Sequence, residues 1–354
     1  MNQTELQIID QTLRESGFVI AHQWGPQEVS ELAVEIERCG FREMEVCHGC
    51  GIGGFRRGFP GLYHDIDLLK AARKAAPTLR LSVYLDHGPH SLAELELIAD
   101  HFDIGRVGVN VDSVDTIAEH LRKLKAMKKT AMAMLLRIHR FTPEQTAAAA
   151  ERAIALGAQA IYLVDSYGSM DAAEVKEYLS VVGKRVSVPL GFQARNNTQR
   201  AIANSLAAVE AGVGYLDAAL LGSGRDAGVA NMTLLVALLQ RIGMLRQLNL
   251  FEIQNATWWF LFPRLRRIPY PDLTDLLFAK HRIDFYPKEF IPVLSSIIEI
   301  PQEEFLLRIK SQHPNAVEIG PQELRDALAA EGIKLEVVME YLQTGRVPGL
   351  EGNA

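Results

Sequence analysis

The first apolar run of the chain ends in an arginine beside a carboxylate. Asp10-Gln-Thr-Leu-Arg14-Glu15 follows the short apolar stretch 6–9 and precedes a long helical pattern. A guanidinium next to a carboxylate can bind and polarise an anionic substrate. The same pair could instead be a solvated ion pair that contributes little. The choice depends on what the rest of the chain places around Arg14 and Glu15.

Other reactive side chains recur where later apolar runs end. Four of them, two cysteines and two histidines, offer the soft ligands that favour zinc, and they follow the second and third runs. The alternative is that the cysteines are simply buried and the histidines structural. The four residues are Cys47, Cys50, His87 and His90. The remaining candidates are His22, His139, Asp165, Ser166, Gln193, Arg195, Asn196, Gly222 and Gly224.

These residues lie on a regular alternation of strand-like and helix-like patterns. Eight repeats of about 30 residues predict a (β/α)8 barrel, a TIM barrel, over residues 1–245. A doubly wound open sheet also alternates, but polar and Gly-rich residues follow nearly every strand, which favours the barrel. Strands are expected at 6–10, 44–48, 79–85, 107–111, 130–136, 160–164, 186–192 and 215–221. Helices are expected at 26–39, 65–74, 92–100, 114–127, 142–156, 171–182, 199–211 and up to 242.

The pattern changes after residue 250. Several prolines separate short helical stretches, which predicts a helical C-terminal region over residues 250–345, including helices at 321–330 and 335–342. The apolar patch around Trp258 and Trp259 favours core, with a homodimer interface as the alternative. Tyr270 or Tyr286 could reach the candidate site from this region.

Composition sets bounds on the class of protein. The 354 residues are 48% apolar and 23% charged, which is ordinary for a globular protein. A net charge of −6 gives no electrostatic case for nucleic acid. There is no apolar run of the ~20 residues that cross a bilayer, and we expect no signal peptide. Three cysteines do not make a disulfide framework, so a cytoplasmic location is expected.

Seven motifs in order, spread over residues 5–242, resemble one enzyme family. They are Asp10-x-Thr-Leu-Arg14-Glu15, His22-Gln23, Glu45-Val-Cys-His48-Gly49, Ile138-His139, Tyr162-Leu-Val-Asp165-Ser166-Tyr-Gly168-Ser-Met170, the stretch 204–212 and Leu216-Asp217-Ala-Ala-Leu-Leu-Gly222-Ser-Gly224. The chain resembles the DRE-TIM metallolyases, which are HMGL-like, and among them the 4-hydroxy-2-oxovalerate aldolases look closest. The resemblance implies cleavage or formation of a C–C bond beside a carbonyl, through an enolate such as that of pyruvate. It also implies manganese or magnesium and, for the aldolases, an aldehyde dehydrogenase partner.

The chain departs from the family pattern at the implied metal ligands. An aspartate and an H-x-H pair are replaced by Glu15, Gln193 and Arg195, and an acid–base histidine is replaced by Phe18. Arginine has no lone pair to offer a metal. We therefore expect no metal at this position, with Arg195 supplying positive charge beside Glu15. The alternative is a structural salt bridge that fills a dead site.

The prediction is a divergent aldolase-type lyase acting on a small 2-oxo acid or carboxylate. Arg14 would hold the enolate oxygen, and Glu15 with His22 or His139 would move protons. Substrate contacts are expected from Asp165, Ser166, Gln193, Arg195, Asn196, Gly222 and Gly224. Asp165 and Ser166 could instead cap the next helix, and the glycine-rich loop could hold an anion on its N–H groups. The alternative function is a non-catalytic pseudoenzyme that binds a metabolite or a partner.

Overall fold

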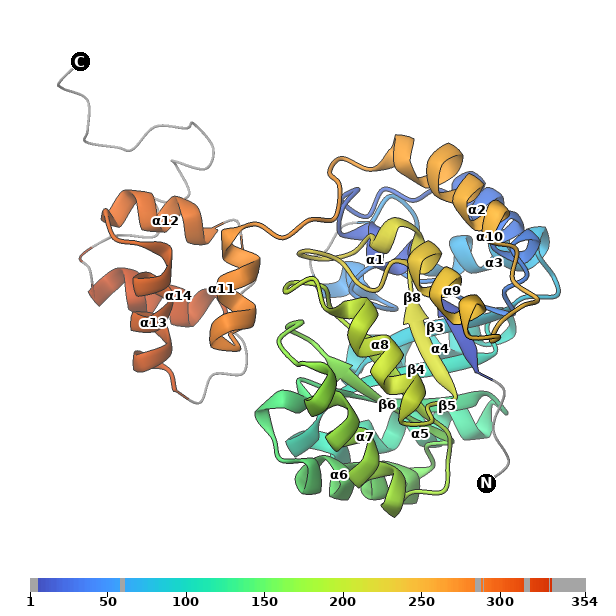
Figure 1. Cartoon of the computed structure of the whole chain (residues 1–354), viewed down its shortest axis with the longest axis horizontal. Helices are drawn as coiled ribbons and strands as arrows, with labels where there is room; N and C mark the ends of the chain where they lie inside the picture. The colour runs from blue at the N-terminus through green and yellow to red at the C-terminus, as the bar shows by residue number, and fades with distance from the viewer. Residues whose placement is uncertain are drawn as a thin grey trace. The chain divides into compact units, whose positions relative to one another are not determined.

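The computed structural model contains a closed barrel of eight parallel strands, with helices outside it (Figure 1). It describes residues 6–57, 61–283, 288, 290–314, 319–330 and 332. Each strand pairs with the next along the chain, and β8 pairs with β1 to close the barrel. The TIM-barrel prediction is confirmed. The strands are β1 Gln7–Asp10, β2 Glu43–Glu45, β3 Arg80–Asp86, β4 Ile104–Asn110, β5 Thr130–Leu136, β6 Ala160–Asp165, β7 Leu190–Ala194 and β8 Tyr215–Ala218.

The barrel helices follow the predicted amphipathic patterns. In α2 the buried positions are Val29, Leu32, Ala33 and Ile36, the spacing that places one face of a helix on a core. The helices are α1 Thr12–Gly17, α2 Pro26–Arg38, α3 Asp65–Ala75, α4 Pro89–Ile98, α5 Ala118–Ala126, α6 Pro143–Leu156, α7 Ala172–Arg185, α8 Ala201–Glu210 and α9 Met232–Arg241. Short turns of helix are η1 Gly54–Arg57, η2 Ala99–His101, η3 Val111–Ile117, η4 Ile138–Arg140 and η5 Leu220–Gly222.

Helix α6 shows how local sequence fixes an element. Thr142 accepts a hydrogen bond from the N–H of Gln145, whose side chain in turn accepts one from the N–H of Thr142. Pro143 occupies the first turn, and Gly157 ends the helix with a positive φ of 118°. These features satisfy backbone groups that a helix end leaves without partners. The predicted N-cap at Thr142 is confirmed.

Several strand boundaries differ from the prediction: β2 and β8 each end three residues earlier than expected, and β4 and β7 begin at other residues. Strand β4 begins at Ile104, three residues before the predicted start, because Gly105 and Arg106 interrupt the apolar pattern. Helix α7 continues to Arg185, so β7 begins at Leu190 and not at Val186. The earlier start of β4 matters for the site, because it places Arg106 inside the barrel wall.

The interior of the barrel holds both apolar and charged side chains. Its apolar members are Ile9, Ile104, Met132, Met134, Ala160, Tyr162 and Val164. Two interior tyrosines fit because glycines face them: a Cβ on Gly108 would lie 2.0 Å from Oη of Tyr84, and one on Gly191 would lie 2.5 Å from the ring of Tyr162. The interior is therefore shaped around a few large polar residues, which form the floor of the candidate site.

The chain divides into two compact units, Met1–Tyr270 and Pro271–Ala354. The first unit continues past the predicted end of the barrel at 245, because α10 lies against α2 and α9 (Figure 1). It ends with α10 Leu250–Asn255, the π-helical turn η6 Ala256–Leu261 and η7 Phe262–Arg264. The second unit contains α11 Leu273–His281, α12 Phe290–Ile298, α13 Gln302–Gln312 and α14 Pro321–Ala330 around its own apolar core. Residues 335–342 and Tyr286 lie outside the described residues.

The aromatic patch in η6 is divided between core and surface. Phe260 is buried and stacks on Trp24, with parallel rings 6.0 Å apart. Trp258 and Trp259 are 44% and 81% exposed. The core interpretation of the tryptophan pair is therefore wrong. In the part of the chain that the structure describes, no helix has the length and apolar character needed to cross a membrane.

Candidate active site

The carboxylate of Glu15 lies between two guanidinium groups at the carboxyl end of the strands. Nη2 of Arg14 lies 2.8 Å from Oε1 of Glu15. Arg195, which follows β7, approaches both oxygens, with Nη1 2.8 Å from Oε2 and Nη2 3.4 Å from Oε1. Glu15 is fully buried and the Arg195 side chain is 10% exposed. The predicted pairing of Glu15 with Arg195 is present in the structure.

The side-chain amide of Gln193 completes this group. Its Nε2 donates to Oε1 of Glu15 at 3.3 Å and to Oε1 of Gln11 at 2.8 Å. Both Glu15 oxygens therefore accept hydrogen bonds from their neighbours. The positive charges of Arg195 and Arg14 hold the pKa of Glu15 below its usual value, against the burial that raises it. Glu15 is a stable carboxylate, and in this state it is a weak base.

A chain of ion pairs leads from Arg14 into the barrel. Nε of Arg14 donates to Glu45 on β2, and the same guanidinium lies 4.8 Å above the ring of Tyr84. Arg106 donates to Glu45 at 3.0 Å and to Asp217 on β8 at 2.5 Å. The charges alternate along Asp217, Arg106, Glu45, Arg14, Glu15 and Arg195. All but Arg195 are at least 94% buried, and we call these six residues the charge chain.

The glycine-rich loop after β8 lies over the Glu15 carboxylate. A Cβ on Gly224 would lie 2.8 Å from Oε2 of Glu15, so only glycine allows this approach. The N–H groups of Gly222 and Ser223 donate to backbone carbonyls of the loop. These two N–H groups are therefore occupied, and the predicted anion cradle is not formed by them. The loop covers the ion pair instead.

The polar residues that follow β6 and β7 hold turns. Asp165 accepts hydrogen bonds from the N–H groups of Ser169 and Met170, both at 3.1 Å. Oγ of Ser166 accepts from the N–H of Arg137 at 2.9 Å. Oδ1 of Asn196 accepts from the N–H of Ala201 at 3.2 Å. The next helix, α7, is capped by Asp171, so the alternative that Asp165 or Ser166 caps it is wrong, and a substrate role for all three residues stays a prediction.

Asp10 and Thr12 fix the end of β1 beneath this site. The hydroxyl and N–H of Thr12 donate to Oδ1 of Asp10, and the Thr12 hydroxyl accepts the N–H of Leu220 at 2.9 Å. Burial raises the pKa of Asp10 from 3.8 to about 7, partly offset by the Thr12 hydrogen bonds. Asp10 therefore titrates in the folded protein near neutral pH.

This shift predicts a pH dependence of stability. Between about pH 4 and pH 7 the folded chain holds a proton that the unfolded chain has released. The free energy of unfolding should therefore fall as pH rises through this window, by about 1.4 kcal/mol per pH unit from this group. Asp10→Asn should remove that part of the slope in denaturant titrations. Equal slopes in the two proteins would contradict the shift.

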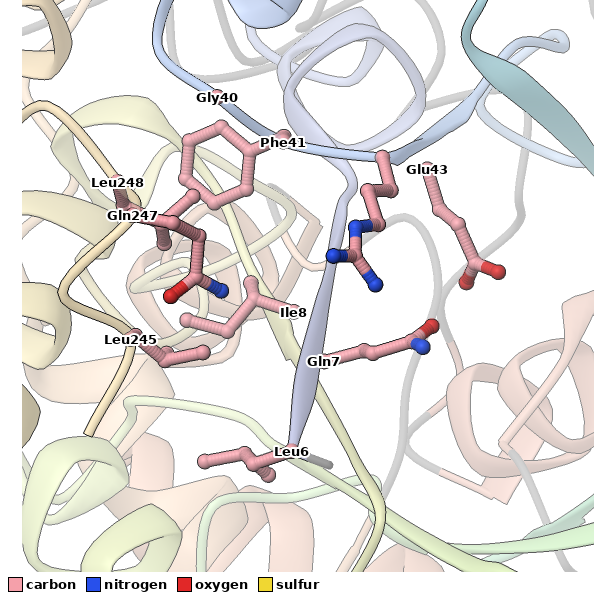
Figure 2. Close-up of a pocket in the computed structure, with 10 residues that line it drawn as sticks. Leu6, Gln7, Ile8, Gly40, Phe41, Glu43, Leu245, Gln247 and Leu248 are labelled. Carbon is pink, nitrogen blue, oxygen red and sulfur yellow. The ribbon is translucent and has the colours of Figure 1, made fainter. Parts of the chain in front are cut away.

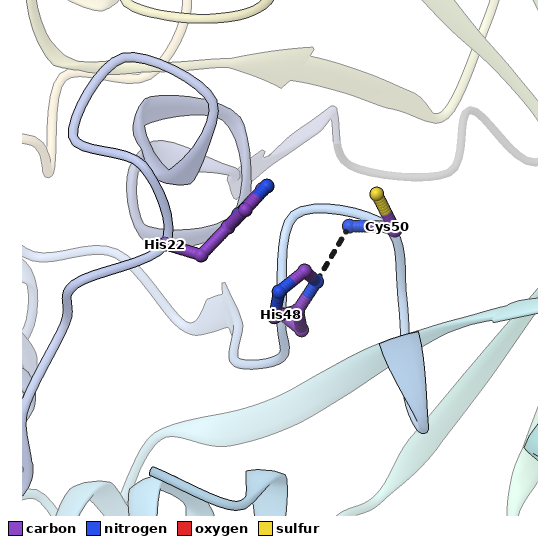
Figure 3. Close-up of side chains that lie close together, drawn as sticks. All are labelled: His22, His48 and Cys50. Atoms are coloured by element: carbon purple, nitrogen blue, oxygen red, sulfur yellow. Dashed lines mark hydrogen bonds between the residues drawn. The ribbon is translucent and has the colours of Figure 1, made fainter. Parts of the chain in front are cut away.

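Two histidines and one cysteine form a separate group (Figure 3). The imidazoles of His22 and His48 stack with centroids 3.9 Å apart. Nδ1 of His48 accepts the N–H of Cys50 at 3.1 Å. Burial lowers the pKa of both histidines to about 4, so both rings are neutral near pH 7. His139 is elsewhere, with its ring 4.4 Å from that of Tyr167.

The structure does not assemble the zinc site expected from Cys47, Cys50, His87 and His90. Cys50 instead joins His22 and His48, and among the described residues this is the only group of three or more such side chains close enough to share a cation. Cys47 is fully buried with its pKa raised by burial. His87 is exposed, and Nε2 of His90 lies 2.9 Å from Asp86. The loops are adjacent as predicted, but these side chains point to different surroundings.

A small cavity lies at the opposite end of the barrel (Figure 2). It measures about 20 Å³, room for about one water molecule. Chemistry in this fold occurs at the carboxyl end of the strands, so the cavity is not the candidate site. It is lined by Leu6, Gln7, Ile8, Gly40, Phe41, Arg42, Glu43, Leu245, Gln247 and Leu248.

Comparison with known proteins places this arrangement in a family. The HMGL-like family profile matches residues 103–258. A 4-hydroxy-2-oxovalerate aldolase of Carboxydothermus hydrogenoformans is 34% identical over 274 residues, which cover 77% of this chain and 80% of the relative. The chain belongs to the HMGL-like family. An aldolase of the same name from Moorella thermoacetica is 32% identical over 75% of this chain and 80% of its own.

The fold of this HMGL-like protein is shared more widely. The carboxyl transferase domain of Rhizobium etli pyruvate carboxylase, solved with pyruvate, matches with a TM-score of 0.76. The match covers 97% of this chain and 65% of that one at 16% identity, so it supports the fold alone. The aldolase names of the sequence relatives agree with the predicted carbon–carbon lyase class.

The HMGL-like resemblance located only part of this site. It identified Arg14, Glu15 and Arg195, but not the role of Glu45, Arg106 and Asp217. The sequence did contain a signal for these residues. A charged residue within a buried parallel strand needs a partner of opposite charge, so each of them indicates a buried ion pair. Arg106 was missed because it fell outside the predicted strand, and sequence spacing could not pair it with Asp217, 111 residues away.

Proposed function

We propose that this HMGL-like protein is a carbon–carbon lyase for a small 2-oxo acid, in which Arg195 takes the place of the family's divalent metal. The observation that carries the proposal is the contact of Arg195 with both oxygens of Glu15. Glu15 and Arg195 stand where the resemblance implies metal ligands. The aldolase names of the relatives support the reaction class.

The three side chains at those positions do not fit a divalent cation. Glu15 directs both oxygens at guanidinium and amide donors. Gln193 turns its amide nitrogen, not its oxygen, towards Glu15. Arg195 has no lone pair and keeps its charge at any physiological pH. A cation at this position would be repelled by the positive charges of Arg14 and Arg195. Its only carboxylate ligand would be Glu15, which both arginines already contact.

Substrate binding requires an exchange of partners, because the charge chain is already balanced. The carboxylate of a 2-oxo acid can pair bidentately with Arg195, the most exposed member of the charge chain. Glu15 would then keep Arg14 but lose the contact that most lowers its pKa. The pKa of Glu15 would rise, and the carboxylate would become a stronger base. Substrate binding would in this way make Glu15 a base strong enough to take part in the reaction.

The reaction follows from these positions. For a 4-hydroxy-2-oxo acid, Glu15 removes the proton of the C4 hydroxyl. The C3–C4 electron pair moves towards the C2 carbonyl, giving an aldehyde and the enolate of the shorter 2-oxo acid. Nε and Nη2 of Arg14 are used by Glu45 and Glu15, so Nη1 is the group for the enolate oxygen. A proton returned to C3 by the Glu15 carboxyl completes the cleavage.

The test is an assay of 4-hydroxy-2-oxo acids for aldehyde and 2-oxo acid release, with and without a chelator. We expect turnover that the chelator leaves unchanged. Arg195→Ala should weaken 2-oxo acid binding by at least about tenfold, as expected for a charge-assisted bidentate contact. Arg185→Ala, at an exposed ion pair with Glu151, is the matched control and should bind normally. Cleavage that requires added manganese would contradict the metal-free proposal.

The second candidate, binding without catalysis, is favoured by one observation. Both oxygens of Glu15 already accept hydrogen bonds, which leaves no free base until a partner is displaced. Saturable 2-oxo acid binding without product would support this candidate. The double variant Gln193→His, Arg195→His then separates two cases. Manganese-dependent cleavage would mean that only the metal ligands were lost, and none would mean that the pocket was rebuilt.

The quaternary predictions belong to the same proposal. The homodimer expected from the aromatic patch is tested by the mass of the purified protein in solution. A partnership with an aldehyde dehydrogenase would give the aldehyde product a direct acceptor. Co-purification of the two proteins, compared with a Trp259→Ala variant of this exposed residue, tests that partnership.

A further inference from the structure

We propose that His22, His48 and Cys50 form a binding site for a thiophilic divalent cation, with Zn²⁺ as the best match. One ligand atom from each side chain lies within 4.8 Å of the other two (Figure 3). Two imidazoles and a thiolate are a common zinc donor set, and three protein ligands leave a fourth position open. The proposal does not rest on the proposed lyase reaction, and none of these residues belongs to the charge chain.

The backbone around the group is shaped to hold two imidazole rings. A Cβ on Gly49 would lie 2.4 Å from the His22 ring, and one on Gly54 would lie 2.5 Å from the His48 ring. His22 itself has a φ of 58°, and the preceding Ala21 has a φ of 53°. Left-handed backbone costs free energy for residues other than glycine and persists where the surroundings enforce it. The fold therefore accepts strain to turn the His22 ring towards His48.

Each of the two histidines has one buried ring nitrogen without a hydrogen-bond partner among the described residues. Within the described part of the chain, Nδ1 of His22 and Nε2 of His48 are buried and have no hydrogen-bond partner. Only 9% of His48 is exposed. A buried polar atom without a partner is costly, and a bound cation is one of the groups that would satisfy it.

Asp65 holds the loop that carries two of the three ligands. Its Oδ1 accepts the N–H of His48 at 2.7 Å, and its Oδ2 accepts the N–H of Gly53 at 2.9 Å. The carboxylate thus fixes the backbone on both sides of Cys50. Supporting contacts of this kind orient metal ligands in known sites.

Metal binding requires a modest contraction of the group. Tetrahedral zinc places its nitrogen and sulfur ligand atoms about 3.4–3.6 Å apart, so separations of up to 4.8 Å must close by at most about 1.4 Å. Cys50 lies in a turn and its N–H donates to Nδ1 of His48 at 3.1 Å. If Nδ1 is the ligand, the metal replaces this hydrogen bond. If Nε2 is the ligand, the ring proton moves to Nδ1 and the same hydrogen bond is lost. Zinc binding should therefore move the turn at Cys50.

The test uses Co²⁺ and Zn²⁺ on the full-length protein. We expect one equivalent of Zn²⁺ to be retained after desalting. Co²⁺ should give the near-ultraviolet charge-transfer band of a cobalt–thiolate bond. Cys50→Ser should abolish that band and weaken Zn²⁺ binding at least tenfold in competition with a chelating dye. Cys39→Ala removes a buried thiol outside the group and is the matched control, with band and affinity unchanged.

Two results would overturn the proposal. One is a wild-type protein that retains no Zn²⁺ and shows no cobalt–thiolate band. The other is a band that survives Cys50→Ser, which would assign the thiolate to another cysteine. His48→Asn provides a second variant that leaves the thiol in place. If it keeps the wild-type affinity for Zn²⁺ while folding normally by circular dichroism, the assigned ligands are wrong.

Discussion

Arg106→Ala should lower the free energy of unfolding by about 3–5 kcal/mol. Arg106 is fully buried and donates to Glu45 and Asp217, while its guanidinium lies 4.6 Å above the Tyr162 ring. Removing it leaves Asp217 buried without a cation, with only the Gln11 amide as a donor among the described residues, while Glu45 keeps Arg14. A buried charge that loses its partner has neither solvent nor a counter-ion. Denaturant unfolding of the two proteins measures the effect.

The effects of lost side-chain volume and of lost charge on the free energy of unfolding can be measured separately at position 106. Arg106→Met fills most of the space, so a loss of similar size would assign the effect to charge. Asp217→Asn in the Arg106→Met background should recover part of the loss, because it removes one stranded carboxylate. Arg185→Ala, at an ion pair whose side chains are 40% and 43% exposed, should change stability by about 1 kcal/mol at most. Wild-type stability in Arg106→Met would contradict an ionised network.

Arg14→Lys should lower kcat/KM of the proposed cleavage by about 10²–10³-fold, the usual cost of losing one aligned donor to a developing oxyanion. Lysine keeps the charge that Glu15 and Glu45 require, so the fold should survive. It lacks the planar fork with which Arg14 contacts both carboxylates through Nη2 and Nε and still has Nη1 for the enolate oxygen. Steady-state kinetics of the purified variant give the measurement.

Tyr84→Phe is the control for this prediction. It keeps the aromatic ring beneath the Arg14 guanidinium, at 4.8 Å, and removes only the hydroxyl. We expect its activity to stay within a few-fold of the wild type. Arg14→Lys with nearly wild-type turnover would mean that the enolate oxygen is held elsewhere, and the roles assigned to Arg14 and Glu15 would need to be exchanged or abandoned.

The sequence was sufficient for the barrel and for one half of the candidate site. Periodicity placed the helices, and the resemblance selected Arg14, Glu15 and Arg195, whose contact the structure confirms. The other half depends on tertiary contacts. Glu45, Arg106 and Asp217 come from three strands, and sequence spacing does not show which interior side chains meet.

The zinc hypothesis grouped the wrong side chains, and metal binding at either group stays a prediction. Loop adjacency in a barrel suggested that cysteine and histidine would meet, which they do at Cys50. The direction of each side chain was decided by backbone detail, such as the left-handed conformation at His22 and the turn at Cys50. Neither His22 nor Cys50 is a glycine, so the residue type at these positions did not indicate an unusual backbone conformation.

The mutual dependence of Glu15 and Arg195 also limits how this site can change over evolutionary time. A substitution of Arg195 alone leaves the fully buried Glu15 without its bidentate partner, and a substitution of Glu15 alone leaves Arg195 facing Arg14 across the gap. Each single step towards a metal-binding sequence therefore passes through a less stable protein. Substitutions in the loops around the pair should therefore be tolerated far better than a substitution of Glu15 or Arg195 alone.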